Sequence, residues 1–143
     1  MTTNPRPALE SRLDPAATGA FLRSVGLQID RIAPDEVLAH LEATEEHHTP
    51  WGLVHGGLYT TVIESVATIG AVAAVQDAGL VAVGVSNQTD FLRPHRLGRL
   101  EVRGTPIQQG KTLQLWLVEL TNAEHKVVAR GQVRLFNQPL AQA

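Results

Sequence analysis

The sequence contains no cysteine, few aromatic residues and no strong excess of either charge. Without cysteine, disulfides and thiolate catalysis are both excluded. With 12 basic and 14 acidic residues the net charge is −2, which offers no basic surface to a nucleic acid. Hydrophobic residues make up 43% of the chain and charged residues 18%, a balance typical of a globular protein. A length of 143 residues predicts one domain of ordinary size.

The N-terminal segment lacks the apolar core of a signal peptide and contains three prolines within residues 1–15. We therefore expect a flexible tail over residues 1–15, a single domain over residues 16–137 and a C-terminal tail over residues 138–143. No apolar run reaches membrane length without a charged or small polar interruption. These features favour a cytoplasmic protein that binds neither membranes nor nucleic acids.

The hydrophobic pattern predicts an α+β domain in which strands surround one long helix. The segment 58–77 is rich in Ala, Val, Ile and Leu, lacks proline and is too long for a strand. We expect a helix of about five turns there, buried on most faces and ended by Gly79. A shorter helix is expected over residues 16–25, with Gly26 at its end. Antiparallel strands are expected over residues 27–32, 37–43, 82–92, 100–108, 112–121 and 127–136.

Glu64 is the one ionisable residue in the apolar part of the long helix. A carboxylate in a buried helix is costly unless it is paired or used, so Glu64 is the first candidate for a catalytic group. Thr60, Thr61 and Thr68 lie on the same helix face, three or four residues from it. For Thr60 and Thr61 we favour hydroxyls that bond back to helix carbonyls. For Thr68 this alternative and a water held beside Glu64 are equally open.

The helix is preceded by the tripeptide His55-Gly56-Gly57. Paired glycines allow a ligand to approach the backbone closely. At a helix start, unpaired N–H groups and the helix dipole favour a developing negative charge. Glycines that open a helix carrying a lone Glu therefore predict an oxyanion site.

The segment WGLVHGG, with a helical Glu eight residues after its first Gly of the pair, resembles the hotdog-fold acyl-CoA thioesterases. The resemblance is strongest to the 4-hydroxybenzoyl-CoA thioesterase branch that uses Glu, related to the phenylacetate-pathway thioesterases. It continues through AVGVSNQTDFLRP and the QGKT turn and covers roughly residues 20–136. It implies a hotdog fold, in which a curved antiparallel sheet of five to six strands wraps a long central helix. It also implies a homodimer with active sites shared between subunits, assembled into a homotetramer.

The same resemblance implies hydrolysis of an aromatic or medium-sized acyl-CoA without a cofactor. Glu64 then acts as nucleophile or as general base on water, and the sequence leaves both open. The N–H of Gly56 is the implied oxyanion donor, Thr68 matches the position that holds the water, and His55 shapes the loop.

One position departs from the family pattern. A Gln usually stands six residues before the motif His and helps to hold the thioester oxygen, whereas this chain has Thr49, with His48 beside it. A Thr hydroxyl is shorter and donates one hydrogen bond, so either His48 takes over or the acyl group sits differently.

Four residues are implied in binding the rest of the substrate. Gly57 belongs to the substrate-binding loop, and Arg93, Lys111 and Thr112 match positions that contact the nucleotide of coenzyme A. For Lys111 a solvated residue of a hairpin turn is an equal alternative.

Three rival interpretations are weaker. A metal site at His47, His48 and His55 is not expected, because adjacent histidines point opposite ways and no carboxylate pair completes the ligand set. A hotdog dehydratase or hydratase pairs a His with an acidic residue near the acyl α-carbon, whereas His55 stands in a Gly-Gly loop. A non-catalytic acyl-CoA sensor would carry a DNA-binding segment, for which the length and charge leave no room.

Overall fold

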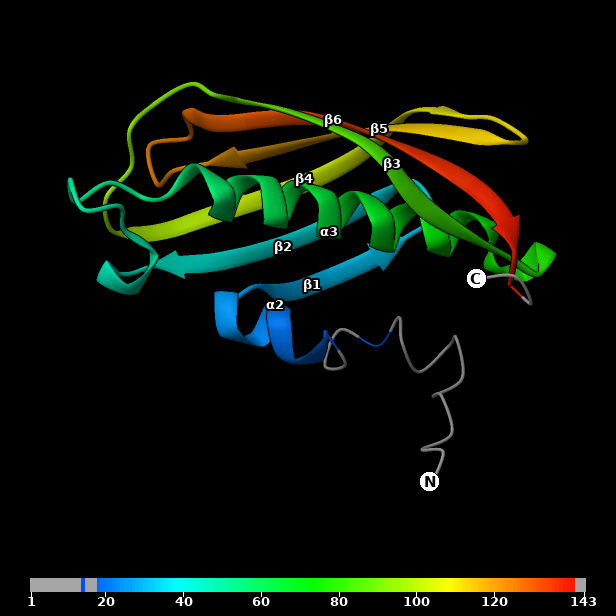
Figure 1. The fold of residues 1–143 in the computed structure, drawn as a ribbon, viewed down its shortest axis with the longest axis horizontal. Coiled ribbons are helices and arrows are strands. Elements are labelled where there is room, and N and C mark those ends of the chain that lie inside the picture. Colours follow the sequence, from blue (N-terminus) through cyan, green and yellow to red (C-terminus); the bar gives the residue numbers. More distant parts are fainter. Residues whose placement is uncertain (1–13, 15–17, 141–143) are drawn as a thin grey trace.

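The computed structural model describes residue 14 and residues 18–140, which fold into one curved sheet around a central helix (Figure 1). The elements in chain order are α2 (Gly19–Val25), β1 (Gln28–Ala33), β2 (Glu36–Ala43), the 3-10 helix η1 (Glu45–His47), α3 (Gly56–Val75), the 3-10 helix η2 (Gln76–Ala78), β3 (Leu80–Phe91), β4 (Gly98–Gln109), β5 (Leu113–Thr121) and β6 (Val127–Pro139). Their six strands are antiparallel, in the order β1-β2-β4-β5-β6-β3. The expected hotdog fold is confirmed.

Glycines set the ends of both predicted helices. Helix α3 begins at Gly56, two residues before the predicted start, because the glycine pair itself forms its first turn. Beyond Val75, η2 continues to a left-handed Gly79 with φ 73°. Helix α2 ends at Gly26, also left-handed with φ 84°. Only glycine adopts this conformation without strain, so both stops were readable in the sequence.

The ends of the chain extend beyond what the structure describes. Apart from Asp14, the segment expected as an N-terminal tail lies outside the described residues. At the other end, β6 continues to Pro139, which pairs with Leu80 of β3. The last strand therefore runs three residues past its predicted end and into the range expected as a C-terminal tail.

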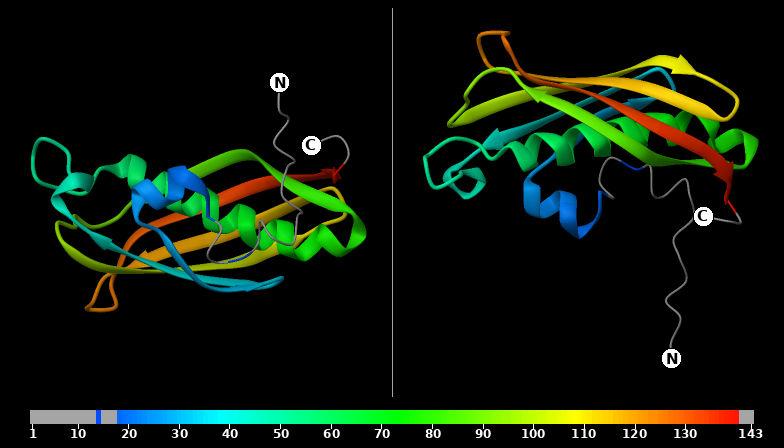
Figure 2. Two further views of the ribbon diagram at one scale, coloured as in Figure 1. Left: turned by 90° about the horizontal axis from the view of Figure 1, so that it is seen from below. Right: turned by 45° about the horizontal axis from the view of Figure 1, so that its top comes forward.

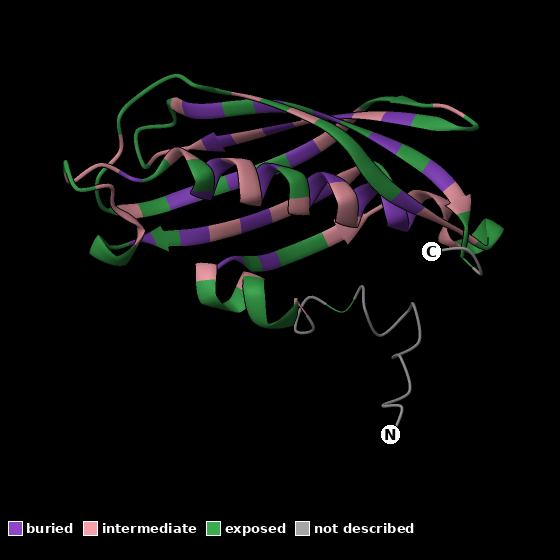
Figure 3. Cartoon of the chain, in the orientation of Figure 1, coloured by how far each residue is buried: buried purple, intermediate pink, exposed green. Residues whose placement is uncertain are grey.

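Helix α3 packs against the sheet with one side only. Ten of its 20 residues are buried, and Figure 3 shows buried, intermediate and exposed residues alternating along it. The expectation of burial on most faces is wrong, because the sheet covers one side of the helix and α2 covers only part of the other (Figure 2). Together α3 and η2 are long and apolar enough to cross a membrane. However, 56% of their most apolar 18-residue stretch is buried inside this fold, as in the core helix of a globular domain.

The C-terminal half of α3 contacts the sheet through Trp116 of β5. Trp116 is fully buried, and a Cβ atom on Gly70 would lie 2.4 Å from its Cη2 atom. The indole Nε1 donates to the Gln114 side chain at 2.9 Å, and Gln114 Nε2 donates to the Ala71 carbonyl at 3.0 Å. The sheet is thereby fixed to the helix backbone by buried hydrogen bonds, which are costly to break.

A second buried amide, Asn137 of β6, holds the turn between β4 and β5. Gln114 Nε2 also donates to Asn137 Oδ1 at 2.9 Å. Asn137 Nδ2 in turn donates to the carbonyls of Gly110 at 3.1 Å and Lys111 at 3.2 Å. The position of this turn is therefore tied to the core rather than left to solvent.

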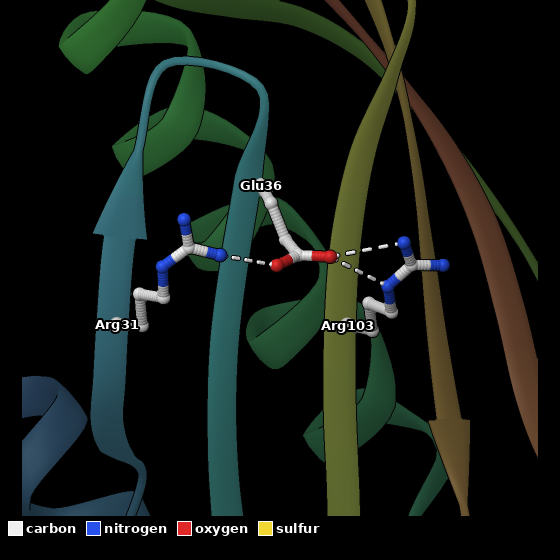
Figure 4. Close-up of polar contacts among 3 residues, drawn as sticks. All are labelled: Arg31, Glu36 and Arg103. Atoms are coloured by element: carbon white, nitrogen blue, oxygen red, sulfur yellow. Dashed lines mark hydrogen bonds and ion pairs between the residues drawn. The ribbon is translucent and has the colours of Figure 1, made fainter.

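The outer face of the sheet carries ion pairs across neighbouring strands. Glu36 of β2 accepts from Arg31 of β1 at 2.5 Å and from Arg103 of β4 at 2.9 Å, as Figure 4 shows. Because both arginines are largely exposed, each pair contributes about 1 kcal/mol or less. These contacts help to align β1 with its neighbours and lie on the face away from α3.

Replacing Gly70 with Ala should destabilise the protein, although Ala normally favours a helix. The new Cβ would overlap the Trp116 ring, which overpacks the core at a cost of about 1–3 kcal/mol. Ser65→Ala, on the open side of the same helix, is the control and should shift the free energy of unfolding by about 0.5 kcal/mol or less. Urea denaturation measures both, and an unchanged midpoint for Gly70→Ala would contradict the packing described here.

Candidate active site

Glu64 lies on the side of α3 that the sheet leaves open. Contrary to the expectation of a buried carboxylate, its side chain is exposed in the single chain. Within the described part of the chain, the carboxylate makes no hydrogen bond or ion pair. A Cβ atom on Gly84 of β3 would lie 3.2 Å from Glu64 Oε1, so the carboxylate rests against a strand position without a side chain.

A cavity of about 440 Å³, which we call the Glu64 cavity, adjoins this carboxylate. Its polar wall comes from α3 and consists of Thr61, Glu64, Ser65 and Thr68. The rest of the lining is mostly apolar and comes largely from α2 and β1: Asp14, Thr18, Phe21, Leu22, Ile29, Ile32 and Ile69. A carboxylate beside a mainly apolar hollow of this size suits a ligand with an apolar body and a reactive polar group.

The threonine hydroxyls of α3 fall into two groups, those that bond back to the helix and one that does not. Thr60 Oγ1 donates to the Gly56 carbonyl and Thr61 Oγ1 to the Gly57 carbonyl, each at 2.9 Å, which confirms back-bonding for both. Thr68 Oγ1 bonds to no described residue. Its hydroxyl therefore remains free for a water or a ligand, one turn from Glu64 in the same cavity.

His55 caps the start of α3 and leaves one N–H group open. Its ring Nδ1 accepts from the Gly57 N–H at 2.8 Å, so the N–H of Gly57 is occupied. The next N–H, of Leu58, bonds to the His55 carbonyl at 2.9 Å. Among described residues the N–H of Gly56 has no partner, so it is the open donor at the positive end of the helix dipole.

That glycine lines a second cavity, of about 270 Å³, which we call the Gly56 cavity. Its other walls are Leu53, Val54, Tyr59, Phe91, Leu92, Arg93, Pro94 and His95. A Cβ atom on Gly56 would lie 2.5 Å from Phe91 Cε2, so the ring packs directly on the backbone. No described residue is common to the linings of the Glu64 and Gly56 cavities. One chain thus presents the carboxylate and the open N–H in different places.

His48 and Thr49, the residues near the missing Gln, are held within their loop. His48 Nε2 donates to the Arg96 carbonyl at 2.6 Å. Thr49 Oγ1 accepts from the Trp51 N–H at 3.4 Å, a long and weak bond. Neither residue lines the Gly56 cavity. Among the described residues, no group of three or more His, Cys, Asp or Glu side chains could hold a metal ion.

The structure separates the residues expected to bind the nucleotide. Arg93 lines the Gly56 cavity, near the start of α3. Lys111 and Thr112 belong to the turn between β4 and β5, which lies at the opposite end of the domain, where α3 ends (Figure 1). A single chain therefore does not bring the three together.

Sequence reasoning missed Tyr59, which reads as one more residue on the buried side of the helix. The residue is only 3% exposed, and its hydroxyl has no hydrogen-bond partner among described residues. Burial raises the pKa of the Tyr59 phenol to about 12. Its ring centroid lies 5.8 Å from that of Phe91. The sequence carries no signal for this, because a buried Tyr normally finds a partner for its hydroxyl and the lack of one depends on its neighbours in the fold.

Comparison with known proteins assigns the family. The profile of the thioesterase superfamily matches residues 52–129. Over 134 residues the chain is 38% identical to "Putative esterase Rv1847" of Mycobacterium tuberculosis, covering 92% of this chain and 96% of that protein. It is 31% identical over 102 residues to acyl-coenzyme A thioesterase 13 of Homo sapiens, covering 70% and 71% of the two chains.

The crystal structure of S. sahachiroi AziG superimposes with a TM-score of 0.82 at 41% identity, covering 85% of this chain and 98% of that one. The chain belongs to the thioesterase superfamily. The enzyme class expected from the sequence, a thioester hydrolase, is the class that this family's name denotes.

Because Tyr59 is the only tyrosine, its ionisation can be followed directly by tyrosinate absorbance. The native protein should titrate near pH 12 and the denatured chain near pH 10.0. As the pH rises between these values the unfolded state loses the proton first, so the free energy of unfolding should fall in this window. A native midpoint near pH 10.0 would show that the phenol is not buried.

Proposed function

We propose that this protein is an acyl-CoA thioesterase of the Glu-using 4-hydroxybenzoyl-CoA type, acting on aromatic or medium-sized acyl groups. One observation carries the proposal: the same helix bears an open N–H at its start and a free carboxylate beside a mostly apolar cavity. The human relative named as an acyl-coenzyme A thioesterase supports coenzyme A as the thiol part of the substrate.

The chemistry needs a donor for the thioester oxygen and an oxygen that attacks its carbon. The N–H of Gly56 stabilises the negative charge that develops on the carbonyl oxygen. Glu64 either attacks the carbonyl carbon or removes a proton from a water that Thr68 helps to hold. In both routes the C–S bond breaks, coenzyme A leaves as the thiol, and water supplies the second oxygen of the released carboxylate. The chain's own residues provide every group, so no cofactor enters.

The hydratase alternative is disfavoured by the position of His55. That reaction requires a His beside the acidic residue, near the acyl α-carbon. The ring of His55 is instead engaged by the Gly57 N–H at the helix start and lines neither of the two cavities. Hydrolysis needs no such pairing.

The free edge of β3 supports a dimer with shared sites. β3 is an end strand of the sheet, 12 residues long, and Val83 and Val85 on it are 40% and 58% exposed. A long exposed edge of this kind offers unpaired backbone groups to another strand, and a two-fold axis lets two copies of β3 pair antiparallel.

Antiparallel pairing of two copies of β3 also explains why the two cavities are separate. With the two-fold axis near Asn87 and Gln88, in the middle of the strand, Gly84 of one copy lies close to Phe91 of the other. Gly84 lies against Glu64, and Phe91 packs on Gly56. The dimer thus brings the carboxylate of one chain toward the open N–H of the other. We propose that two such dimers assemble into a homotetramer.

Arg93 fits a role in binding coenzyme A because it lines the cavity that contains Gly56. Its guanidinium can pair with a phosphate at the mouth of that cavity. Lys111 and Thr112 lie at the other end of the domain and reach the nucleotide only from another copy. Their turn is held by Asn137, which presents it in a fixed orientation.

Glu64→Gln should retain the fold and lose at least about a hundredfold in turnover, because the amide neither attacks nor accepts a proton. Asp77→Asn removes an exposed carboxylate just beyond the same helix and is the control, expected to keep full activity. Thiol release from a panel of acyl-CoA substrates measures activity and acyl preference together. Turnover of Glu64→Gln within a few-fold of the parent protein would remove Glu64 from the mechanism.

Two inactive variants should complement each other if every site is shared. One chain carries Glu64→Ala. The other carries Gly56→Pro, which lacks the donor N–H, together with Phe91→Ala to accommodate the proline ring. Random pairing makes half of the dimers hybrids, and each hybrid has one fully native site, so about a quarter of parental activity should return.

The two variants are first shown to fold and to pair, by circular dichroism and by mass spectrometry of the mixed dimers. Each variant refolded alone is the control and should stay inactive. A mixture that contains hybrids yet remains inactive would place the N–H and the carboxylate of one site in the same chain.

A further inference from the structure

Tyr59 is a buried polar group that the proposed mechanism does not use. It lines the Gly56 cavity, is 3% exposed, and its hydroxyl bonds to nothing in the described part of the chain. A buried hydroxyl without a partner destabilises a protein, whereas Phe would fill nearly the same space without that penalty. A residue that costs stability and lies in a ligand cavity is a candidate for function.

The position of Tyr59 on α3 directs its side chain toward Gly56. The two residues are three apart, and helical side chains lean back over the preceding turn. Phe91 contacts both: its ring lies 5.8 Å from the Tyr59 ring, and its edge lies where a Cβ atom of Gly56 would be. The phenol and the open N–H therefore share one small space.

Other donors near the Gly56 N–H are already engaged. The neighbouring N–H of Gly57 is taken by His55, and Nε2 of His48 is taken by the Arg96 carbonyl. The hydroxyl of Thr49 lies in the turn at Trp51 and outside the cavity. An oxyanion is usually stabilised by more than one preorganised donor, and the phenol is an unpaired donor that lines the same cavity as Gly56.

We propose that the Tyr59 hydroxyl is the second hydrogen-bond donor to the thioester carbonyl oxygen bound at the Gly56 N–H. The inference rests on the proposed thioesterase function and adds a catalytic residue to it. The phenol keeps its proton throughout the neutral pH range, because its ordinary pKa is already 10.0 and burial raises that pKa to about 12. The Tyr59 hydroxyl, unpaired in the free protein, gains a hydrogen-bond partner when the carbonyl oxygen of the substrate binds.

The kinetics and the stability of the Tyr59→Phe variant together test the proposed hydrogen bond. We expect kcat to fall by about tenfold or more with KM within about threefold, since a donor to the oxyanion acts mainly in the transition state. The Tm should stay the same or rise, because an unpaired buried hydroxyl is removed. Thr60→Val deletes a hydroxyl of the same turn that lines neither cavity, and it should leave kcat within about twofold.

Two analogues of coenzyme A locate the contact without catalysis. In one, a ketone with a methylene in place of sulfur keeps the carbonyl oxygen; in the other, an S-alkyl thioether lacks it. Tyr59→Phe should bind the ketone about tenfold more weakly than the parent protein does and the thioether equally well. Equal losses for both analogues, or none, would overturn the proposal.

The outcomes separate this inference from the function on which it rests. If the parent protein hydrolyses no acyl-CoA, the thioesterase assignment fails. If the parent is active and Tyr59→Phe keeps kcat within about twofold, or loses activity together with a lower Tm, only the role of Tyr59 fails.

Discussion

The structure depends on close contact between α3 and one curved sheet. Glycines at three positions make this contact possible: a Cβ atom on Gly70 would overlap Trp116, one on Gly104 would lie 2.8 Å from Val66, and one on Gly131 would lie 2.8 Å from Ile63. Because side chains are missing at these points, large groups from the opposite layer lie against the backbone, at the density expected of a protein core. A buried hydrogen bond from Gln114 to the Ala71 carbonyl then joins the sheet to the helix.

A sheet that covers one side of a helix leaves the other side uncovered. Polar side chains lie on that uncovered side, where Glu64 and Thr68 have no protein partner within the described residues and are free to meet a ligand. The domain's unfinished surfaces, the open face of α3 and the free edge of β3, adjoin each other at Gly84. A second copy placed there would complete the sheet and the site in one step, which is why we attribute catalysis to a dimer rather than to one chain.

The start of α3 leaves two polar groups unpaired within the described residues, at a cost in stability. His55 satisfies one N–H of the first turn and leaves its neighbour at Gly56 unpaired, although a cap normally serves to satisfy such groups. Tyr59, one turn further, keeps a buried hydroxyl without a partner. These two unpaired donors at one cavity are a cost to the free protein, and we propose that an acceptor carrying negative charge binds to both.

The sequence by itself determined what depends on local pattern: the strand order along the chain, the long helix, its glycine stops and the motif joining Gly56 to Glu64. It also favoured the back-bonding of Thr60 and Thr61, which helix geometry permits and the structure shows. Only the tertiary structure decided that Glu64 is exposed, that Gly56 and Glu64 line different cavities, and that Lys111 lies far from Arg93. Periodicity shows that a helix is apolar, but the number of sides that become buried depends on how far the sheet curves around it. Tyr59 was missed for the same reason, because the absence of a partner is a property of its neighbours and not of its position in the chain.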